Sequence, residues 1–181
     1  MGLMTTIKRI SKFEEIDIIP NSFVILDIDE TLIKFDGIDI KWWKSKFNRF
    51  YKQTRDCDLS DKLAFMEWVK IIDKCEPELV DEQIYMFLDQ VKKAGCKIIL
   101  LTARSQNMDT ITKSHLEKVG LNFLPIHYNE NKGQEILRII NTLDNPHENV
   151  IVVDDMLPNL TDIENTVNFP DIKLHLYNIV Q

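Results

Sequence analysis

Three features that mark other classes of protein are missing from this sequence of 181 residues. No run of 18 apolar residues is present, which excludes a membrane-spanning helix. Positive charge is not in excess, because 22 Lys and Arg face 29 Asp and Glu and the net charge is -7. This balance disfavours a broad electrostatic surface for nucleic acid or anionic lipid. We therefore expect neither a nucleic-acid partner nor a membrane partner.

Cysteine spacing typical of disulfide-rich or zinc-binding proteins is also absent. Cys57, Cys75 and Cys96 are odd in number and widely separated, and none belongs to a C-x-x-C pair. Charged residues interrupt residues 1–20 and no small-residue cleavage site follows an apolar stretch, so no secretory signal is expected. Reduced thiols in a cytoplasmic protein are the expected state.

The residues that are present favour one globular domain with a small insertion. Hydrophobic residues make up 44% and charged residues 28%, close to globular averages. Continuous apolar runs at 23–26, 97–101 and 150–153 predict strands that are buried on both faces of a parallel sheet. Weaker runs at 124–128 and 172–177 predict two more strands.

Helical patterns lie between these strands. Apolar residues recur at helical spacing over 81–94, 107–119 and 132–143, and Gly95 and Gly120 end the first two segments. Alternating strands and helices predict an α/β fold with a Rossmann-like doubly wound parallel sheet.

Residues 36–77 break this alternation and predict a helical insertion after the first strand. Trp42, Trp43, Phe47 and Phe50 fall at helical spacing, and a second apolar stripe follows over 63–72. We expect a core formed by residues 1–35 and 78–181, with residues 36–77 as a small cap. The cap aromatics either pack together or line a substrate cleft, and both interpretations stay open.

Each strong strand ends in a residue with polar chemistry. Asp27, Thr102 and the pair Asp154 and Asp155 follow the three runs, and Lys132 begins the helix after the fourth strand. Ligands of open α/β sheets bind beyond the carboxyl ends of the strands, so these side chains are expected to converge. Clustered carboxylates repel unless a cation such as Mg²⁺ lies between them. With a lysine alongside, such a site predicts phosphoryl transfer.

Four motifs resemble the haloacid dehalogenase (HAD) superfamily, in that family's order and across residues 21–165. The first is the DxDxT motif, Asp27-Ile28-Asp29-Glu30-Thr31. The others are Leu100-Leu101-Thr102-Ala103-Arg104, then Lys132 with Gly133, then Val152-Val153-Asp154-Asp155 with Asn159. The chain is also similar to a poorly characterised group of bacterial HAD phosphatases. The resemblance implies a HAD-like core with a cap after the first motif.

The resemblance also implies chemical roles. Asp27 is the expected nucleophile, which forms an aspartyl-phosphate. Asp29 is the expected general acid and base, and its presence favours phosphatase or phosphomutase chemistry over dehalogenation. Thr102, Ala103, Arg104 and Lys132 are the expected phosphate-binding residues.

Mg²⁺ is the expected cofactor, held by Asp27, the backbone carbonyl of Asp29 and the acids Asp154 and Asp155. Asp155 is favoured as the direct ligand, with Asp154 outside it or paired with Lys132, and the order stays open. Two further alternatives remain: Arg104 binds phosphate or pairs with a carboxylate, and Asn159 supports these acids or caps a helix.

The expected function is a Mg²⁺-dependent phosphatase that hydrolyses a small phosphorylated metabolite, such as a nucleotide or sugar phosphate. The basic residues of the cap are Lys41, Lys44, Lys46, Arg49 and Lys52. They either offset extra phosphate charge or form the solvated face of a helix with an apolar underside, and the solvated face is favoured. The alternatives are a non-catalytic phosphate-binding protein and a phosphotransferase or phosphomutase. A receiver-type signalling domain is disfavoured, because there the acid pair follows the first strand, whereas here it closes the series.

Overall fold

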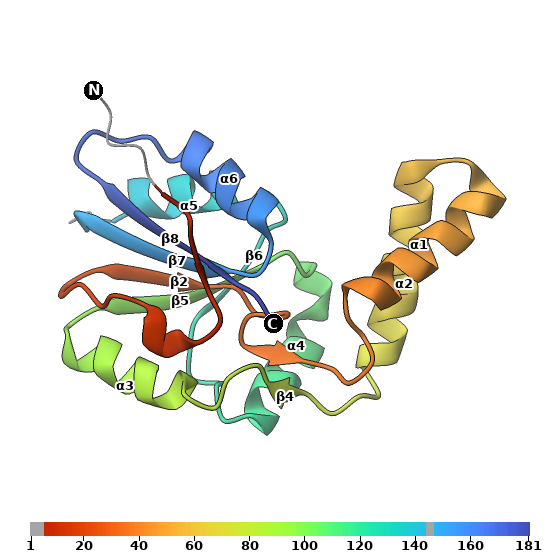
Figure 1. The fold of residues 1–181 in the computed structure, drawn as a ribbon, viewed down its shortest axis with the longest axis horizontal. Coiled ribbons are helices and arrows are strands. Elements are labelled where there is room, and N and C mark those ends of the chain that lie inside the picture. Colours follow the sequence, from red (N-terminus) through yellow and green to blue (C-terminus); the bar gives the residue numbers. More distant parts are fainter. Residues whose placement is uncertain (1–5, 144–146) are drawn as a thin grey trace.

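A six-stranded parallel sheet forms the centre of the molecule (Figure 1). The structure is a computed structural model that describes residues 6–143 and 147–181. The strands follow the order β1 (Lys8–Ile10), β8 (Lys173–Ile179), β7 (Asn149–Asp154), β2 (Phe23–Leu26), β5 (Lys97–Thr102) and β6 (Ile126–Tyr128). Every neighbouring pair is parallel. The predicted Rossmann-like doubly wound fold is confirmed.

Helices cover both faces of this sheet. One face packs against α3 (Ile84–Lys93) and α4 (Asp109–Lys118), and the other against α5 (Lys132–Asn141) and α6 (Leu157–Thr166). Successive residues of a strand point to opposite faces, so Val24 joins the first core cluster and Ile25 the second. Both faces need apolar residues, which explains the continuous apolar runs. Short 3₁₀ helices lie at η1 (Phe13–Glu15) and η2 (Gln106–Met108).

The position of β2 creates a crevice at one edge of the sheet. β2 lies between β5 and β7, and the chain builds β5 and β6 on one side before it crosses to β7 and β8. Beyond the end of β2, the Asp27 N–H still donates to the Val153 carbonyl at 3.0 Å. This reversal of strand order is the place where open α/β sheets bind ligands.

A helical hairpin stands beside this edge (Figure 1). It consists of α1 (Ile40–Thr54) and α2 (Cys57–Ile72), and it is joined to the core through an antiparallel pair, β3 (Ile33–Lys34) and β4 (Glu78–Leu79). Asp39 caps α1 by accepting hydrogen bonds from the N–H groups of Lys41 and Trp42. The hairpin therefore begins at a defined residue close to the crevice.

Two features of the chain path differ from the sequence-based expectation. The strand at 23–26 is the second in the chain, because β1 precedes it at the sheet edge. The hairpin follows the short strand β3 and does not directly follow β2. β1 has three residues and only Ile10 is buried, so its sequence has no apolar run to detect. Among the helices described, none combines the length and apolar character needed to cross a membrane.

Candidate active site

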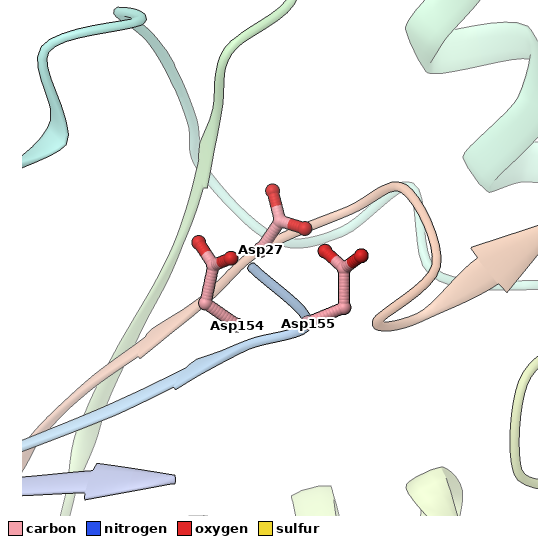
Figure 2. Close-up of side chains that lie close together, drawn as sticks. All are labelled: Asp27, Asp154 and Asp155. Carbon is pink, nitrogen blue, oxygen red and sulfur yellow. The ribbon is translucent and has the colours of Figure 1, made fainter. Parts of the chain in front are cut away.

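Three carboxylates meet at the ends of β2 and β7. Asp27 follows β2, Asp154 ends β7 and Asp155 comes next, and Figure 2 shows their carboxyl groups projecting to the same side. One oxygen from each lies within 4.8 Å of the others. The adjacency of β2 and β7 in the sheet produces this cluster from residues more than a hundred positions apart.

Lys132 bridges two of these carboxylates. Its Nζ lies 2.6 Å from Asp27 Oδ1 and 2.6 Å from Asp154 Oδ2, and all three side chains are buried. Burial alone would lower the pKa of the Lys132 ammonium, but the charges on Asp27 and Asp154 outweigh burial and raise it. The lysine is therefore a fixed positive charge beside Asp27.

One ammonium does not balance three carboxylates. Burial raises the pKa of Asp27, and the charges on Asp154 and Asp29 add to this. Burial also raises the pKa of Asp155, with further contributions from Asp27 and Asp154. Within residues 6–143 and 147–181, no hydrogen bond or ion pair reaches the Asp155 carboxylate. Such a set of hard oxygen donors suits a divalent cation with several waters, and these residues could hold one.

The turn after β2 fixes the position of Asp27. The Thr31 hydroxyl donates to Asp27 Oδ2 at 3.0 Å and accepts from the Asp155 N–H at 3.1 Å. Glu30 has φ 58°, a left-handed conformation that reverses the chain between Asp29 and Thr31. Thr31 thus joins the two acidic segments, a role that its place in DxDxT did not reveal.

Asn178 is a supporting residue that the sequence interpretation missed. Its Nδ2 donates to the backbone carbonyl of Asp155 at 2.7 Å and to that of Asp154 at 3.2 Å. It lies in β8, directly opposite Asp154 in the parallel register. A polar residue near the end of the last apolar run was the available signal.

Asp29 forms a two-pronged ion pair with Arg104. Arg104 Nη2 donates to Asp29 Oδ1 at 2.6 Å, and its Nε donates to Oδ2 at 2.8 Å. The sequence left open whether Arg104 binds phosphate or pairs with a carboxylate, and in the structure it pairs with the Asp29 carboxylate. Arg104 is buried and also donates to Thr112 Oγ1 at 3.1 Å. His115 Nδ1 lies 3.3 Å from Arg104 Nη1, so the histidine helps to hold the guanidinium in place.

Thr102 and Asn159 complete the contacts around the carboxylates. Thr102 Oγ1 accepts from the Arg104 N–H at 3.1 Å, and both Thr102 and Ala103 line the cavity described below. Asn159 Nδ2 donates to Asp154 Oδ1 at 3.1 Å, so it supports the acid pair. Asp154 accepts from Lys132 and Asn159 and lies outside the cavity wall, whereas Asp155 lines it. The contact with Lys132 is one of the two alternatives left open for Asp154.

A cavity of about 1220 Å³ lies between the sheet edge and the hairpin. Asp27, Asp29, Thr102, Arg104 and Lys132 all line it. The opposite wall carries aromatic side chains from both helices of the hairpin: Trp42, Trp43, Phe47, Phe65 and Trp68. The predicted site residues therefore converge on one space, except Asp154, which lies behind its wall.

Comparison with known proteins places the chain in a family. A family profile described as "Protein of unknown function (DUF2608)" matches residues 4–129. The chain belongs to that family. The matched residues include Asp27, Asp29 and Arg104, together with the whole hairpin, while Lys132 and Asp155 follow them. No match is found among curated proteins. The family description names no activity.

The basic residues of α1 do not line the cavity, which agrees with the solvated helix face and not with the alternative that they offset phosphate charge. Lys46 Nζ lies 3.1 Å from Glu67 Oε2 on α2, and Arg49 pairs with the same carboxylate. Lys41, Lys44 and Lys52 are exposed. The helical period places Trp42, Trp43 and Phe47 toward the cavity and directs these cations elsewhere.

Proposed function

We propose that this protein is a Mg²⁺-dependent phosphatase that hydrolyses a small phosphate monoester through an aspartyl-phosphate on Asp27. One observation carries the proposal: the Asp27 carboxylate lies at the crevice of the sheet, held by Lys132 and Thr31, and faces a large cavity. The resemblance of the four motifs to HAD phosphatases supports the same chemistry.

In the first half of the reaction, an oxygen of Asp27 attacks phosphorus and the bond from phosphorus to the alcohol oxygen breaks. Lys132 offsets the negative charge of the phosphoryl group as it meets the carboxylate. The Thr102 hydroxyl lines the cavity and can donate to a phosphoryl oxygen, because its contact with the Arg104 N–H uses only its acceptor side.

Proton transfer is assigned to Asp29. It gives a proton to the leaving alcohol oxygen, and in the second half it takes one from the water that attacks phosphorus and releases Asp27. Both Asp29 oxygens accept hydrogen bonds from Arg104, so this role requires Arg104 to shift. A phosphate dianion in the cavity offers Arg104 another bidentate acceptor, which makes the shift feasible.

The donor set fits Mg²⁺. Asp27 and Asp155 supply carboxylate oxygens, the Asp29 carbonyl is a third candidate, and Asp154 stays with Lys132 and Asn159. When bound, the ion neutralises charge on the phosphoryl group and on the clustered acids. Those acids carry raised pKa values through burial, and a cation beside them favours their ionised forms.

The test is phosphate release from nucleotides, sugar phosphates and an aryl phosphate, with Mg²⁺ and with EDTA. We expect Mg²⁺-dependent release from wild type and a loss of at least about a thousandfold in Asp27→Asn. Asp89→Asn is the matched control, because Asp89 is an exposed carboxylate on α3 that pairs with the exposed Lys93, away from the cavity. It is expected to keep full activity.

Two further readouts separate the alternatives. Acid-quenched enzyme should carry a phosphate that hydroxylamine removes, as an acyl phosphate requires. Mg²⁺ should raise the melting temperature of wild type, and Asp155→Asn should abolish that rise. Full activity in Asp27→Asn would overturn the covalent mechanism, and transfer to an added alcohol without net release would identify a phosphotransferase. Phosphate binding without turnover of any compound would favour the non-catalytic alternative.

A further inference from the structure

The cavity beside Asp27 is much larger than a phosphate group. Its volume of about 1220 Å³ exceeds the roughly 300–1,000 Å³ of common small-molecule pockets. The groups assigned to phosphate lie at the sheet edge, so the hairpin wall faces the rest of the substrate. The side chains of that wall therefore indicate what kind of alcohol the phosphate ester carries.

Aromatic rings make up much of the hairpin wall. Trp42, Phe65 and Trp68 also pack partly against the larger core cluster. Trp43 and Phe47 pack against neither core cluster formed by the described residues, although both line the cavity and are partly buried. Core packing does not account for these two rings. Rings in such a position favour stacked or edge contacts with another aromatic ring.

Charged side chains around the cavity, apart from the groups assigned to phosphate and Mg²⁺, are mainly negative. Besides Asp27, Asp29 and Asp155, the lining includes Asp39, Asp58 and Asp61 in or next to the hairpin, and Glu30 and Glu130 in loops at the sheet edge. Among the described lining residues, Lys62 is the one lysine or arginine besides Lys132 and Arg104. Both of those are already paired with carboxylates. A second negative charge on the ligand would be repelled here, whereas a neutral or positive group would not.

We propose that the substrate is a phosphate monoester whose alcohol carries an aromatic ring and no second negative charge. The proposal rests on the phosphatase function above and narrows it to a class of ester. A nucleoside monophosphate or an arylmethyl phosphate belongs to this class. A sugar bisphosphate does not, because it lacks the ring and adds an anion.

Matched esters test the ring. Benzyl phosphate and cyclohexylmethyl phosphate have similar size and leaving-group chemistry but differ in aromaticity. We expect kcat/KM to favour benzyl phosphate by about threefold to tenfold. Trp43→Ala should remove this preference and Trp43→Phe should keep most of it. Phe50→Ala is the control, because Phe50 is a partly buried ring of α1 that does not line the cavity.

A charged pair of esters tests the second half of the proposal. Carboxybenzyl phosphate should have a kcat/KM about fivefold or more below that of aminomethylbenzyl phosphate. Asp61→Lys should reduce this difference several-fold, because it replaces an acid of the wall with a cation. Glu117→Lys makes the same change of charge at an exposed position of α4, outside the cavity, and should leave the difference unchanged.

Binding measurements show whether the proposed class of substrate or the proposed phosphatase reaction is wrong. Benzylphosphonate and cyclohexylmethylphosphonate cannot be hydrolysed, and calorimetry measures their binding without turnover. Ring-selective binding with no hydrolysis of any ester would overturn the phosphatase and retain a cavity selective for aromatic phosphates. Equal binding and equal hydrolysis of the matched pair would overturn the inference, as would a preference for the carboxylated ester.

Discussion

The two walls of the cavity are built in different ways. At the sheet edge, Asp27 is 7% exposed and Lys132 is 3% exposed, and each makes at least two polar contacts with other site residues. In the hairpin, α1 has no buried residue at all, and Trp43 is held by neither core cluster within the described chain. The sheet wall is thus fixed by burial and polar contacts, whereas the part of the hairpin wall formed by α1 is less buried.

This difference separates two tasks of a binding site. Charge stabilisation depends on groups that are fixed before the ligand arrives, and the contacts around Asp27 provide that. Recognition of the rest of a ligand tolerates some movement, and half-exposed rings on a small hairpin permit it. Substitutions in the sheet wall should therefore cost stability, and those in the hairpin should mainly change selectivity.

The strongest test of this contrast removes one cation from the sheet wall and one from the hairpin behind the other wall. Lys132→Met leaves two buried carboxylates without their partner, and we expect the free energy of unfolding to fall by about 3–5 kcal/mol. Lys46→Met breaks a half-exposed pair with Glu67 and should cost at most about 1 kcal/mol. Urea unfolding in EDTA at neutral pH measures both. Equal losses would show that the hairpin is as tightly built as the sheet edge.

Much of the sheet wall could be predicted from the sequence. Apolar runs followed by Asp27, Thr102 and Asp155 mark strand ends, and parallel strands bring their carboxyl ends to one edge. Lys132 was predictable in the same way, because it begins the helix after the fourth strand. These inferences need only local patterns and one rule of sheet topology.

Other features depend on partners that are distant in the chain. The short strand β1 exists because Lys8 pairs with Tyr177, which no local pattern reveals. Arg104 pairs with Asp29, 75 positions away, and the sequence alone left that choice open. The direction of the cap lysines depends on how α1 packs against α2, so the sequence alone left open whether they face the cavity or solvent.

The pH dependence of the free energy of unfolding gives a second comparison of the sheet edge with the hairpin, with a smaller expected loss. Glu135 is buried on α5 behind the sheet edge, and hydrogen bonds from Arg138, with others from Asn129 and His127, lower its pKa to about 2. A carboxyl with a lowered pKa stabilises the fold above its unfolded pKa of about 4.3, and this stability is lost as pH falls toward 2. Glu135→Gln should therefore cost about 2 kcal/mol at pH 7 and almost nothing near pH 2.

The hairpin provides the comparison for that experiment. Glu67 pairs with Lys46 and Arg49 and its pKa is also lowered, but the pair is partly exposed to solvent. Glu67→Gln should leave the midpoint of global unfolding nearly unchanged at both pH values. Chemical denaturation of both variants from pH 2 to pH 7 gives the two curves. A pH-independent loss in Glu135→Gln would mean that the carboxylate charge is not the cause.

The smallest predicted effect asks whether the hairpin opens independently of the sheet. Asp39→Ala removes the side chain that accepts from the Lys41 and Trp42 N–H groups, which is worth about 1 kcal/mol. If α1 opens locally, its amides should exchange with solvent about fivefold faster, while those of β2 and β5 stay unchanged. Hydrogen exchange measured by mass spectrometry resolves these segments. The control is Asp36→Ala, an exposed substitution three residues before the helix-capping Asp39. Equal acceleration in β2 and β5 would mean that hairpin and sheet unfold as one unit, and selectivity could then not be altered through the hairpin without a cost to the fixed carboxylates.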